Sequence, residues 1–298
     1  MNYFPIDYIE PVFRPPSEAN SLILQVSNGC SYNKCTFCEM YTSPKKKFKL
    51  KSIDLIEQEL DSVSKSIPNF KRFFLADGDA MTLSFRRLKE ILQSIKKFYP
   101  GRERVTAYCL PRNIKKKTVE ELTELRELGL TMVYVGCESG DDKVLECIVK
   151  GETFETSKEA LLKLKAAGIK SSVMILNGLG GQKFSKQHAI NTAKLMNETQ
   201  PEFVSTLVVS FPVGEERFRE GFNGDYIPLE QGQLFQEIRL LIANFELENT
   251  VFRSDHASNY LVLKGDLGAD KERLLKTIDM AINKPGTIPL RQEWQRGL

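Results

Sequence analysis

Short apolar segments alternate with longer amphipathic ones through most of this 298-residue chain. The apolar runs are bounded by turn residues and predict six strands, at residues 21–27, 71–76, 104–109, 131–137, 170–177 and 202–210. Between them, leucine and isoleucine recur at helical spacing and predict helices at residues 53–66, 83–97, 119–128, 154–167 and 186–198. Such alternation is typical of a parallel sheet with helical crossovers. The sequence therefore predicts an α/β fold, a partial or near-closed parallel (β/α)6-type barrel.

The alternation weakens beyond Gly214, and the rest of the chain is expected to form an extension of the barrel. A helix is predicted at residues 228–245, extended chain at 250–263 and a last amphipathic helix at 269–282. No low-complexity linker separates these parts. We predict an N-terminal segment over residues 1–20, a core barrel over 21–214, and a C-terminal α+β extension over 215–298 that packs on the core and completes or plugs it.

Composition favours a soluble cytoplasmic protein without a membrane span. Hydrophobic residues make up 41% and charged residues 27% of the chain, and no apolar run is long enough to cross a bilayer. The N-terminus lacks the basic start and apolar stretch of a secretory signal. A formal net charge of +3 does not indicate nucleic acid as a partner, and the lysines between residues 45 and 51 are expected to form a solvated loop.

Three of the six cysteines fall within nine residues, in the segment NGCSYNKCTFCEMY directly after the first predicted strand. Cys30, Cys35 and Cys38 have the spacing C-x4-C-x2-C, which is a poor disulfide framework. Zinc sites usually have four protein ligands, but this chain has no second CxxC and only two histidines. A cubane iron–sulfur cluster can take three cysteines and leave one iron open. The trio therefore indicates such a cluster, with three structural cysteines as the alternative.

These residues and their surroundings resemble the radical S-adenosylmethionine (SAM) superfamily, in particular its Elp3/MiaB/coproporphyrinogen-oxidase-like core, over roughly residues 21–214. Members usually have C-x3-C-x2-C with an aromatic residue before the last cysteine, a place that Phe37 takes here, whereas the first spacing is one residue longer. The resemblance implies that the trio binds a [4Fe–4S] cluster and that the open iron binds SAM. It also implies reductive cleavage of SAM to a 5′-deoxyadenosyl radical, which abstracts hydrogen from a substrate that the sequence does not identify.

The same resemblance implies cofactor contacts at the ends of later strands. The Asp77-Gly78-Asp79 turn stands where the family has a Gly-Gly-Glu segment that receives the amino group of SAM, although the first glycine is replaced. Other positions match a strand-end Glu-Ser, a basic residue that pairs with the methionine carboxylate, and a glycine-rich turn near the adenine. The implied cofactor-binding residues are Phe37, Asp77, Gly78, Asp79, Glu138, Ser139, Lys150 and Gly178. Taken singly, these are also ordinary turns, caps and an exposed lysine.

Polar residues gather at 253–259 in the C-terminal extension, between apolar flanks, and the segment resembles the tails of one subgroup of the superfamily. We expect Arg253, His256 and Asn259 to face the substrate; the alternative is a hydrogen-bonded brace for the last helix. The scattered Cys109, Cys137 and Cys147 are expected to be buried as small apolar side chains, the alternative being a radical or second metal site at the strand ends.

The resemblance implies an enzyme that takes electrons from reduced flavodoxin or ferredoxin. The rival is a non-catalytic iron–sulfur protein that transfers electrons or senses redox state. Such a protein needs no adenosyl pocket, and four cysteines would normally complete its cluster. Binding of SAM to the reconstituted protein separates the two hypotheses.

Overall fold

The computed structural model describes residues 5–212 and 214–296, which form two compact units. The first unit comprises Met1–Asn33, Met40–Val135 and Leu162–Ser171, and the second Lys34–Glu39, Gly136–Leu161 and Ser172–Leu298. Residues 1–4 of the predicted N-terminal segment, and residues 297–298 of the extension, lie outside the described residues. In the described part of the chain, no helix is both long enough and apolar enough to span a membrane.

Parallel strands form the centre of the first unit. They are hydrogen-bonded in the order β1 (Leu22–Gln25), β4 (Arg72–Ala76), β5 (Arg104–Cys109) and β6 (Leu130–Glu138), the last of which continues into the second unit. Four successive residues of β4, Phe73–Ala76, have no exposed surface. A strand that is buried on both faces is expected in a parallel sheet covered by helices.

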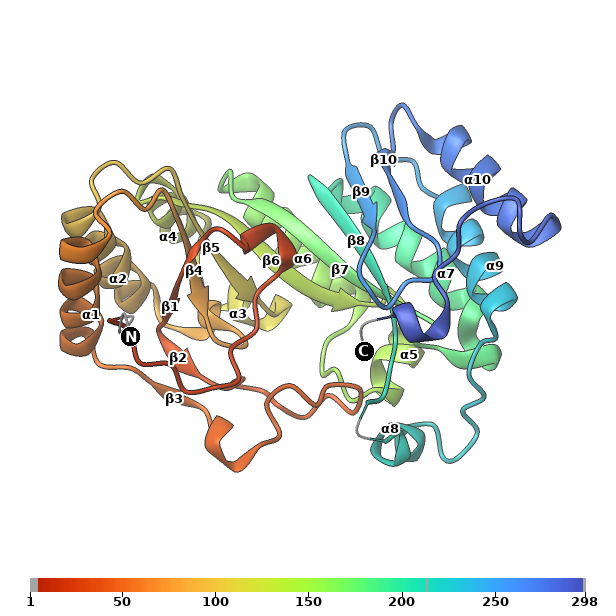
Figure 1. The fold of residues 1–298 in the computed structure, drawn as a ribbon, viewed down its shortest axis with the longest axis horizontal. Helices are drawn as coiled ribbons and strands as arrows, with labels where there is room; N and C mark the ends of the chain where they lie inside the picture. The colour runs from red at the N-terminus through yellow and green to blue at the C-terminus, as the bar shows by residue number, and fades with distance from the viewer. Residues whose placement is uncertain (1–4, 213, 297–298) are drawn as a thin grey trace. The chain divides into compact units, whose positions relative to one another are not determined.

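The helices of the first unit begin at side-chain caps. Ser52 caps α1 (Ile53–Ser66), Ser84 caps α2 (Phe85–Phe98), and Thr118 caps α4 (Val119–Glu127), each by accepting a hydrogen bond from a backbone N–H in the first turn. Figure 1 shows α1 and α2 packed side by side. The short elements of this unit are α3 (Pro111–Lys115), the antiparallel pair β2 (Ser27–Asn28) and β3 (Lys49–Leu50), and the 3-10 turns η1 (Pro16–Glu18), η2 (Pro44–Lys46) and η3 (Ala80–Thr82).

The strands of the second unit are ordered β7 (Lys170–Asn177), β8 (Phe203–Val208), β9 (Val251–Ser254) and β10 (Leu263–Asp266). Neighbouring strands are parallel except β9 and β10, which are antiparallel. The C-terminal extension therefore continues the sheet, because β9 pairs in parallel with β8. The helices are α5 (Asp142–Cys147), α6 (Phe154–Ala166), which runs into the first unit, α7 (Gly181–Thr199), α8 (Glu216–Gly221), α9 (Gln231–Ala243) and α10 (Lys271–Asn283), followed by the 3-10 turn η4 (Glu293–Gln295).

The start of α10 bonds to the free side of β10. Asp270 accepts from the backbone N–H of Asp266 at 2.9 Å, and Arg273 donates to the carbonyl of Lys264 at 2.8 Å. Asp270 and Arg273 are themselves joined by an ion pair of 3.0 Å. Gly265 lies beneath them, where a Cβ atom would come within 2.8 Å of Asp270 and 2.9 Å of Arg273.

The predicted α/β class and its parallel strands are confirmed. All six predicted strands are present, and α1 begins and ends where its pattern does. The extended segment predicted at 250–263 is two short strands joined by a turn. The sequence pattern missed α3, α5 and α8, which are five or six residues long, because fewer than two helical turns cannot establish a period.

Candidate cofactor site

In the first unit, the Asp77-Gly78-Asp79 turn contacts the loop that carries Cys30, residue by residue. The carboxylate of Asp77 accepts from the N–H of Gly29 at 3.2 Å. The N–H of Gly78 donates to the carbonyl of Gly29 at 3.2 Å, and a Cβ atom on Gly78 would lie 2.8 Å from the Cβ of Cys30. Asp79 accepts from the N–H of Ser31 at 2.8 Å and from its hydroxyl at 2.5 Å. The turn therefore fixes the residue before Cys30, Cys30 itself and the residue after it.

Asp77 is also one half of a buried ion pair. Its Oδ2 lies 2.7 Å from Nζ of Lys46, and neither side chain has exposed surface. Lys46 also donates to the carbonyl of Ile9 at 2.5 Å. The other oxygen, Oδ1 of Asp77, is buried and has no hydrogen-bond partner among the described residues. A buried acceptor left in this state is suited to a donor from a ligand. Lys46 is an exception to the solvated loop predicted for the lysine run.

The carboxylate of Asp79 also accepts a hydrogen bond from Nδ2 of Asn113, on α3, at 3.2 Å. Burial raises the pKa of the Asp79 carboxyl, and hydrogen bonds from Ser31, Asn113 and Cys30 oppose that shift without cancelling it. Asn113 lies on a helix too short to be recognised from its sequence, so no pattern pointed to it.

In the second unit, Cys35 and Cys38 lie at the two ends of a tight turn. The N–H of Cys38 donates to the carbonyl of Cys35 at 3.3 Å, and the N–H of Thr36 donates to the carbonyl of Ile148 at 3.0 Å. Cys35 is buried and Cys38 is partly exposed. Phe37 packs against an apolar cluster formed mainly by α5, α8 and their flanks. Packing of the aromatic side chain and pairing of the turn backbone thus hold the C-x2-C segment from both sides.

Lys150 and Glu138 form a second buried ion pair beside this turn. Nζ of Lys150 lies 3.1 Å from Oε1 of Glu138 and 5.6 Å from the ring centre of Phe37. Burial acts to lower the pKa of Lys150, but the negative charges of the Glu138 carboxylate and the Cys35 thiolate outweigh it, so the net shift is upward. Lys150 is therefore a fixed cation and not the exposed lysine that a lone residue usually is.

Ser139 and Gly178 are both engaged by side chains that the sequence did not single out. His188 Nε2 lies 3.1 Å from the carbonyl of Leu176, which can only accept, and its Nδ1 lies 2.7 Å from the hydroxyl of Ser139. A neutral His188 ring therefore carries its proton on Nε2 and accepts at Nδ1 from Ser139. Gly178, with φ of 81°, donates its N–H to Glu237 at 2.6 Å.

The three polar residues of the tail have different surroundings. Asn259 uses both ends of its amide on β8: Oδ1 accepts from the N–H of Val208 at 3.0 Å, and Nδ2 donates to the carbonyl of Thr206 at 2.8 Å. His256 is partly buried and its Nδ1 lies 2.9 Å from the hydroxyl of Ser258. Arg253 is exposed in the middle of β9. The amide of Asn259 thus braces the tail segment against β8, whereas the alternative considered from the sequence was a brace for the last helix.

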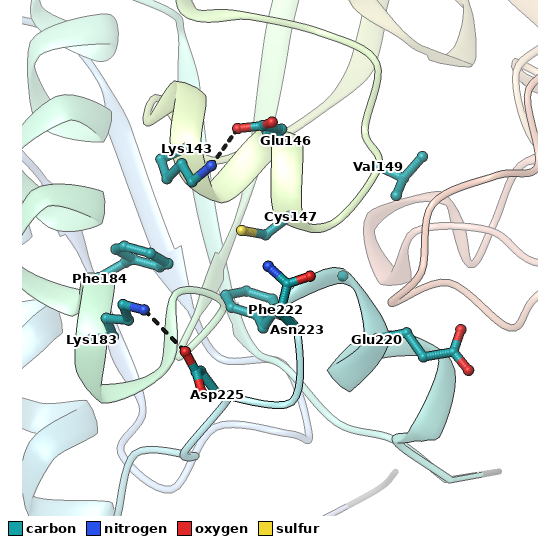
Figure 2. A pocket seen from close by; sticks show the side chains of 11 residues that line it. Lys143, Glu146, Cys147, Val149, Lys183, Phe184, Glu220, Phe222, Asn223 and Asp225 are labelled. Carbon is teal, nitrogen blue, oxygen red and sulfur yellow. Dashed lines mark hydrogen bonds and ion pairs between the residues drawn. The ribbon is translucent and has the colours of Figure 1, made fainter.

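A cavity of about 350 Å³ lies in the second unit (Figure 2) and is lined by Lys143, Glu146, Cys147, Val149, Lys183, Phe184, Glu220, Gly221, Phe222, Asn223 and Asp225. Its two lysines are paired within the wall, Lys143 with Glu146 at 2.6 Å and Lys183 with Asp225 at 3.3 Å. None of the predicted cofactor or substrate residues lines it.

Cys109, Cys137 and Cys147 are buried, as expected for small apolar side chains.

The donor set of the cysteine loop fits an iron–sulfur cluster. All six cysteines are thiols, and backbone contacts hold the residues around the trio. Within residues 5–212 and 214–296, no three His, Cys, Asp or Glu side chains already form a metal-binding group. Cys30 belongs to the first unit, and Cys35 and Cys38 belong to the second.

Comparison with known families decides the assignment. The family model of the radical SAM superfamily matches residues 24–196, more than half of the chain. This chain belongs to the radical SAM superfamily. Members of this superfamily are enzymes that bind a [4Fe–4S] cluster and SAM, so the resemblance based on the cysteine loop is confirmed. The radical SAM match covers all three cysteines and every predicted cofactor residue.

Individual relatives of this radical SAM protein are distant. The heme chaperone HemW of Bacillus subtilis (strain 168) is 23% identical over 160 residues, which are 52% of this chain and 42% of HemW. The tRNA uridine(34) acetyltransferase of Methanocaldococcus infernus is 23% identical over 159 residues, 51% of this chain and 29% of the relative. The chain thus spans less than half the length of either protein.

The fold agrees with a solved radical SAM structure. Coproporphyrinogen III oxidase (HemN) from Escherichia coli, a radical SAM enzyme, superposes with a TM-score of 0.56 at 16% identity, over 75% of this chain and 51% of HemN. At this identity the likeness concerns the fold alone.

Proposed function

We propose that this chain cleaves SAM reductively at a [4Fe–4S] cluster held by Cys30, Cys35 and Cys38, and abstracts hydrogen from a substrate yet to be identified. The observation that carries the proposal is the cradle around Cys30, in which three successive turn residues contact three successive loop residues. The polar groups of a solvent-exposed turn could hydrogen-bond to water instead, and such a turn would not need contacts with all three loop residues. When bound, the reduced cluster would supply the electron that splits SAM into methionine and a 5′-deoxyadenosyl radical.

The protein's own residues would bind and orient the cofactor. In the first unit, Oδ1 of Asp77 is a buried acceptor suited to an ammonium group. In the second unit, Lys150 is a buried cation suited to a carboxylate, although Glu138 already accepts one of its hydrogen bonds. Gly178 is proposed to lie near the adenine because of its place in the glycine-rich turn, although its N–H already donates to Glu237. Arg253 and His256 are retained as substrate-side proposals.

The electron donor and the compartment follow from the same chemistry. We propose reduced flavodoxin or ferredoxin as the donor, because the cluster needs a strong one-electron reductant. We propose a cytoplasmic location, because the three thiols must stay reduced until they bind iron. The substrates of HemW and the tRNA acetyltransferase are not transferred to this chain.

The proposal is tested by anaerobic reconstitution with iron and sulfide. We expect about four iron atoms per chain, as for a single cubane cluster, and we expect 5′-deoxyadenosine when SAM and dithionite are added. Cys38→Ala should lose both properties, whereas Cys147→Ala, which removes a thiol outside the C-x4-C-x2-C motif, should keep them. Stoichiometric zinc and no iron in the wild-type protein would refute the cluster. A cluster that binds no SAM would favour an electron-transfer or redox-sensing protein.

A further inference from the structure

Arg217 joins the C-x2-C turn to a helix that lies about 180 residues later in the chain. Its guanidinium donates through Nη2 to the carbonyl of Cys35 at 2.9 Å and through Nη1 to the carbonyl of Cys38 at 3.4 Å. It also pairs with Glu39 at 3.4 Å. Two of the three proposed ligand residues therefore present their backbone oxygens to one side chain.

The helix that carries Arg217 is firmly held. Phe218, the next residue, is fully buried, and its ring centre lies 4.6 Å from that of Phe211, 4.7 Å from Tyr226 and 5.0 Å from Phe222. Gly221 lets α8 approach the end of α5 so closely that a Cβ atom there would lie 1.8 Å from the carbonyl of Cys147. Because α8 cannot shift without disturbing this aromatic cluster, the helix backbone that carries Arg217 is held in place.

The chemistry of the contact suits a turn that must offer two thiolates to iron. A guanidinium is planar and donates in a fork, so it can fix two carbonyl oxygens at a set separation, which a lysine cannot do. It binds both residues through their carbonyl oxygens. Its positive charge also stabilises negative charge on nearby thiolates, and its ion pair with Glu39 opposes that effect.

We propose that Arg217 is a positioning residue, which holds the Cys35–Cys38 turn in its ligand-presenting conformation and adds a cation beside the cluster. The inference rests on the proposed function, since it takes Cys35 and Cys38 as cluster ligands. None of the motifs in the sequence pointed to this residue, because it lies on a six-residue helix beyond the core pattern.

The test compares Arg217→Gln and Arg217→Lys with Arg219→Gln as the matched control. Arg219 lies on the same helix but donates to the carbonyl of Tyr226 and pairs with Glu215. In metal-free protein, we measure alkylation of each cysteine by iodoacetamide with mass spectrometry. Arg217→Lys, which keeps the positive charge but loses the forked pair of donors, should speed alkylation of Cys35 and Cys38 several-fold relative to Cys30, and the Arg219 control should not.

In reconstituted protein, we measure iron release to a chelator and the midpoint potential of the cluster. Arg217→Gln should release iron about tenfold faster, the lower end of what loss of a ligand-orienting contact costs, and its potential should be more negative because a cation is lost. Arg217→Lys should restore the potential but not the slow iron release, since it keeps the charge and loses the fork.

The outcomes separate this inference from the proposed function. If Arg217→Lys matches the wild type in alkylation and Arg217→Gln matches it in iron release and potential, the inference is overturned. If the wild type takes up no cluster, the proposed function fails, and the alkylation rates still decide whether Arg217 holds the turn. Because Arg217 is partly exposed, its variants should stay folded, which far-ultraviolet circular dichroism checks.

Discussion

Gly78 has no room for a side chain, and this single position shows how closely the cofactor turn is fitted to the cysteine loop. A Cβ atom there would come within 2.8 Å of both the Cys30 Cβ and the ring of Tyr41. From the sequence, Gly78 was assigned only to the turn that the resemblance places at the amino group of SAM. In the structure one of its two closest neighbours is Cys30 itself, and this contact joins residues 48 positions apart that no local pattern contains.

Gly78→Ala should therefore weaken both the fold and the cluster. We expect a loss of about 1–3 kcal/mol in the free energy of unfolding, as for other overpacked sites, together with faster loss of iron after reconstitution. Gly101→Ala is the matched control, because its Cβ would lie 3.6 Å from the end of a lysine side chain. Urea unfolding and iron content provide the two measurements. Equal iron retention in the two variants would contradict a fitted Gly78–Cys30 contact.

At the scale of elements, the sequence pattern succeeded where an element is long and repeats its period. The strands of the core and the helices α1, α2, α4 and α6 were located within a few residues. The short helices were missed, and with them Asn113 on α3, which donates to Asp79, and Arg217 on α8, which donates to the carbonyl of Cys35. His188 lies on α7, a long helix whose pattern was found, but its pairing with Ser139 joins residues 49 positions apart. Such partners become visible only when the chain is folded.

The segment after β9 supplies a prediction about the tail. Asn259→Ala would leave the N–H of Val208 with one fewer acceptor and the carbonyl of Thr206 without its side-chain donor. We expect a loss of about 1–3 kcal/mol in the free energy of unfolding, the usual cost of unsatisfied buried polar groups. Arg253→Ala, at an exposed position on β9, should be nearly neutral for stability. Thermal and urea unfolding measure both variants.

The hypothesis that the tail contacts the substrate predicts a different result for the same variant. If Asn259→Ala retains wild-type stability and cluster content but loses turnover of a substrate once one is known, the side chain serves the substrate and the bracing interpretation fails.

At the scale of the whole molecule, stability should depend on pH partly through His256. Burial and the nearby Arg291 guanidinium lower the pKa of His256 below its ordinary 6.5. The unfolded chain then binds a proton more readily than the native one, so this contribution to stability is present above pH 6.5 and is lost as the pH falls through the native pKa.

His256→Asn removes this titration while keeping an acceptor for the N–H of Ser258. Its melting temperature should fall less than that of the wild type between about pH 7.5 and about pH 5. Differential scanning calorimetry across that range makes the comparison. Parallel curves for the two proteins would show that His256 titrates equally in both states.

The pairing of α10 with β10 bears on how the protein behaves at high concentration. A terminal strand normally offers a row of vacant hydrogen-bonding groups to which another polypeptide can add, the first step toward aggregation. Here Asp270 and Arg273 form hydrogen bonds with two of those groups on β10, one N–H and one carbonyl. Gly265 has no Cβ atom that would collide with these two side chains. The strand is also only four residues long and contains charged Lys264 and Asp266. The end of this sheet is thereby protected against strand addition by a neighbouring molecule.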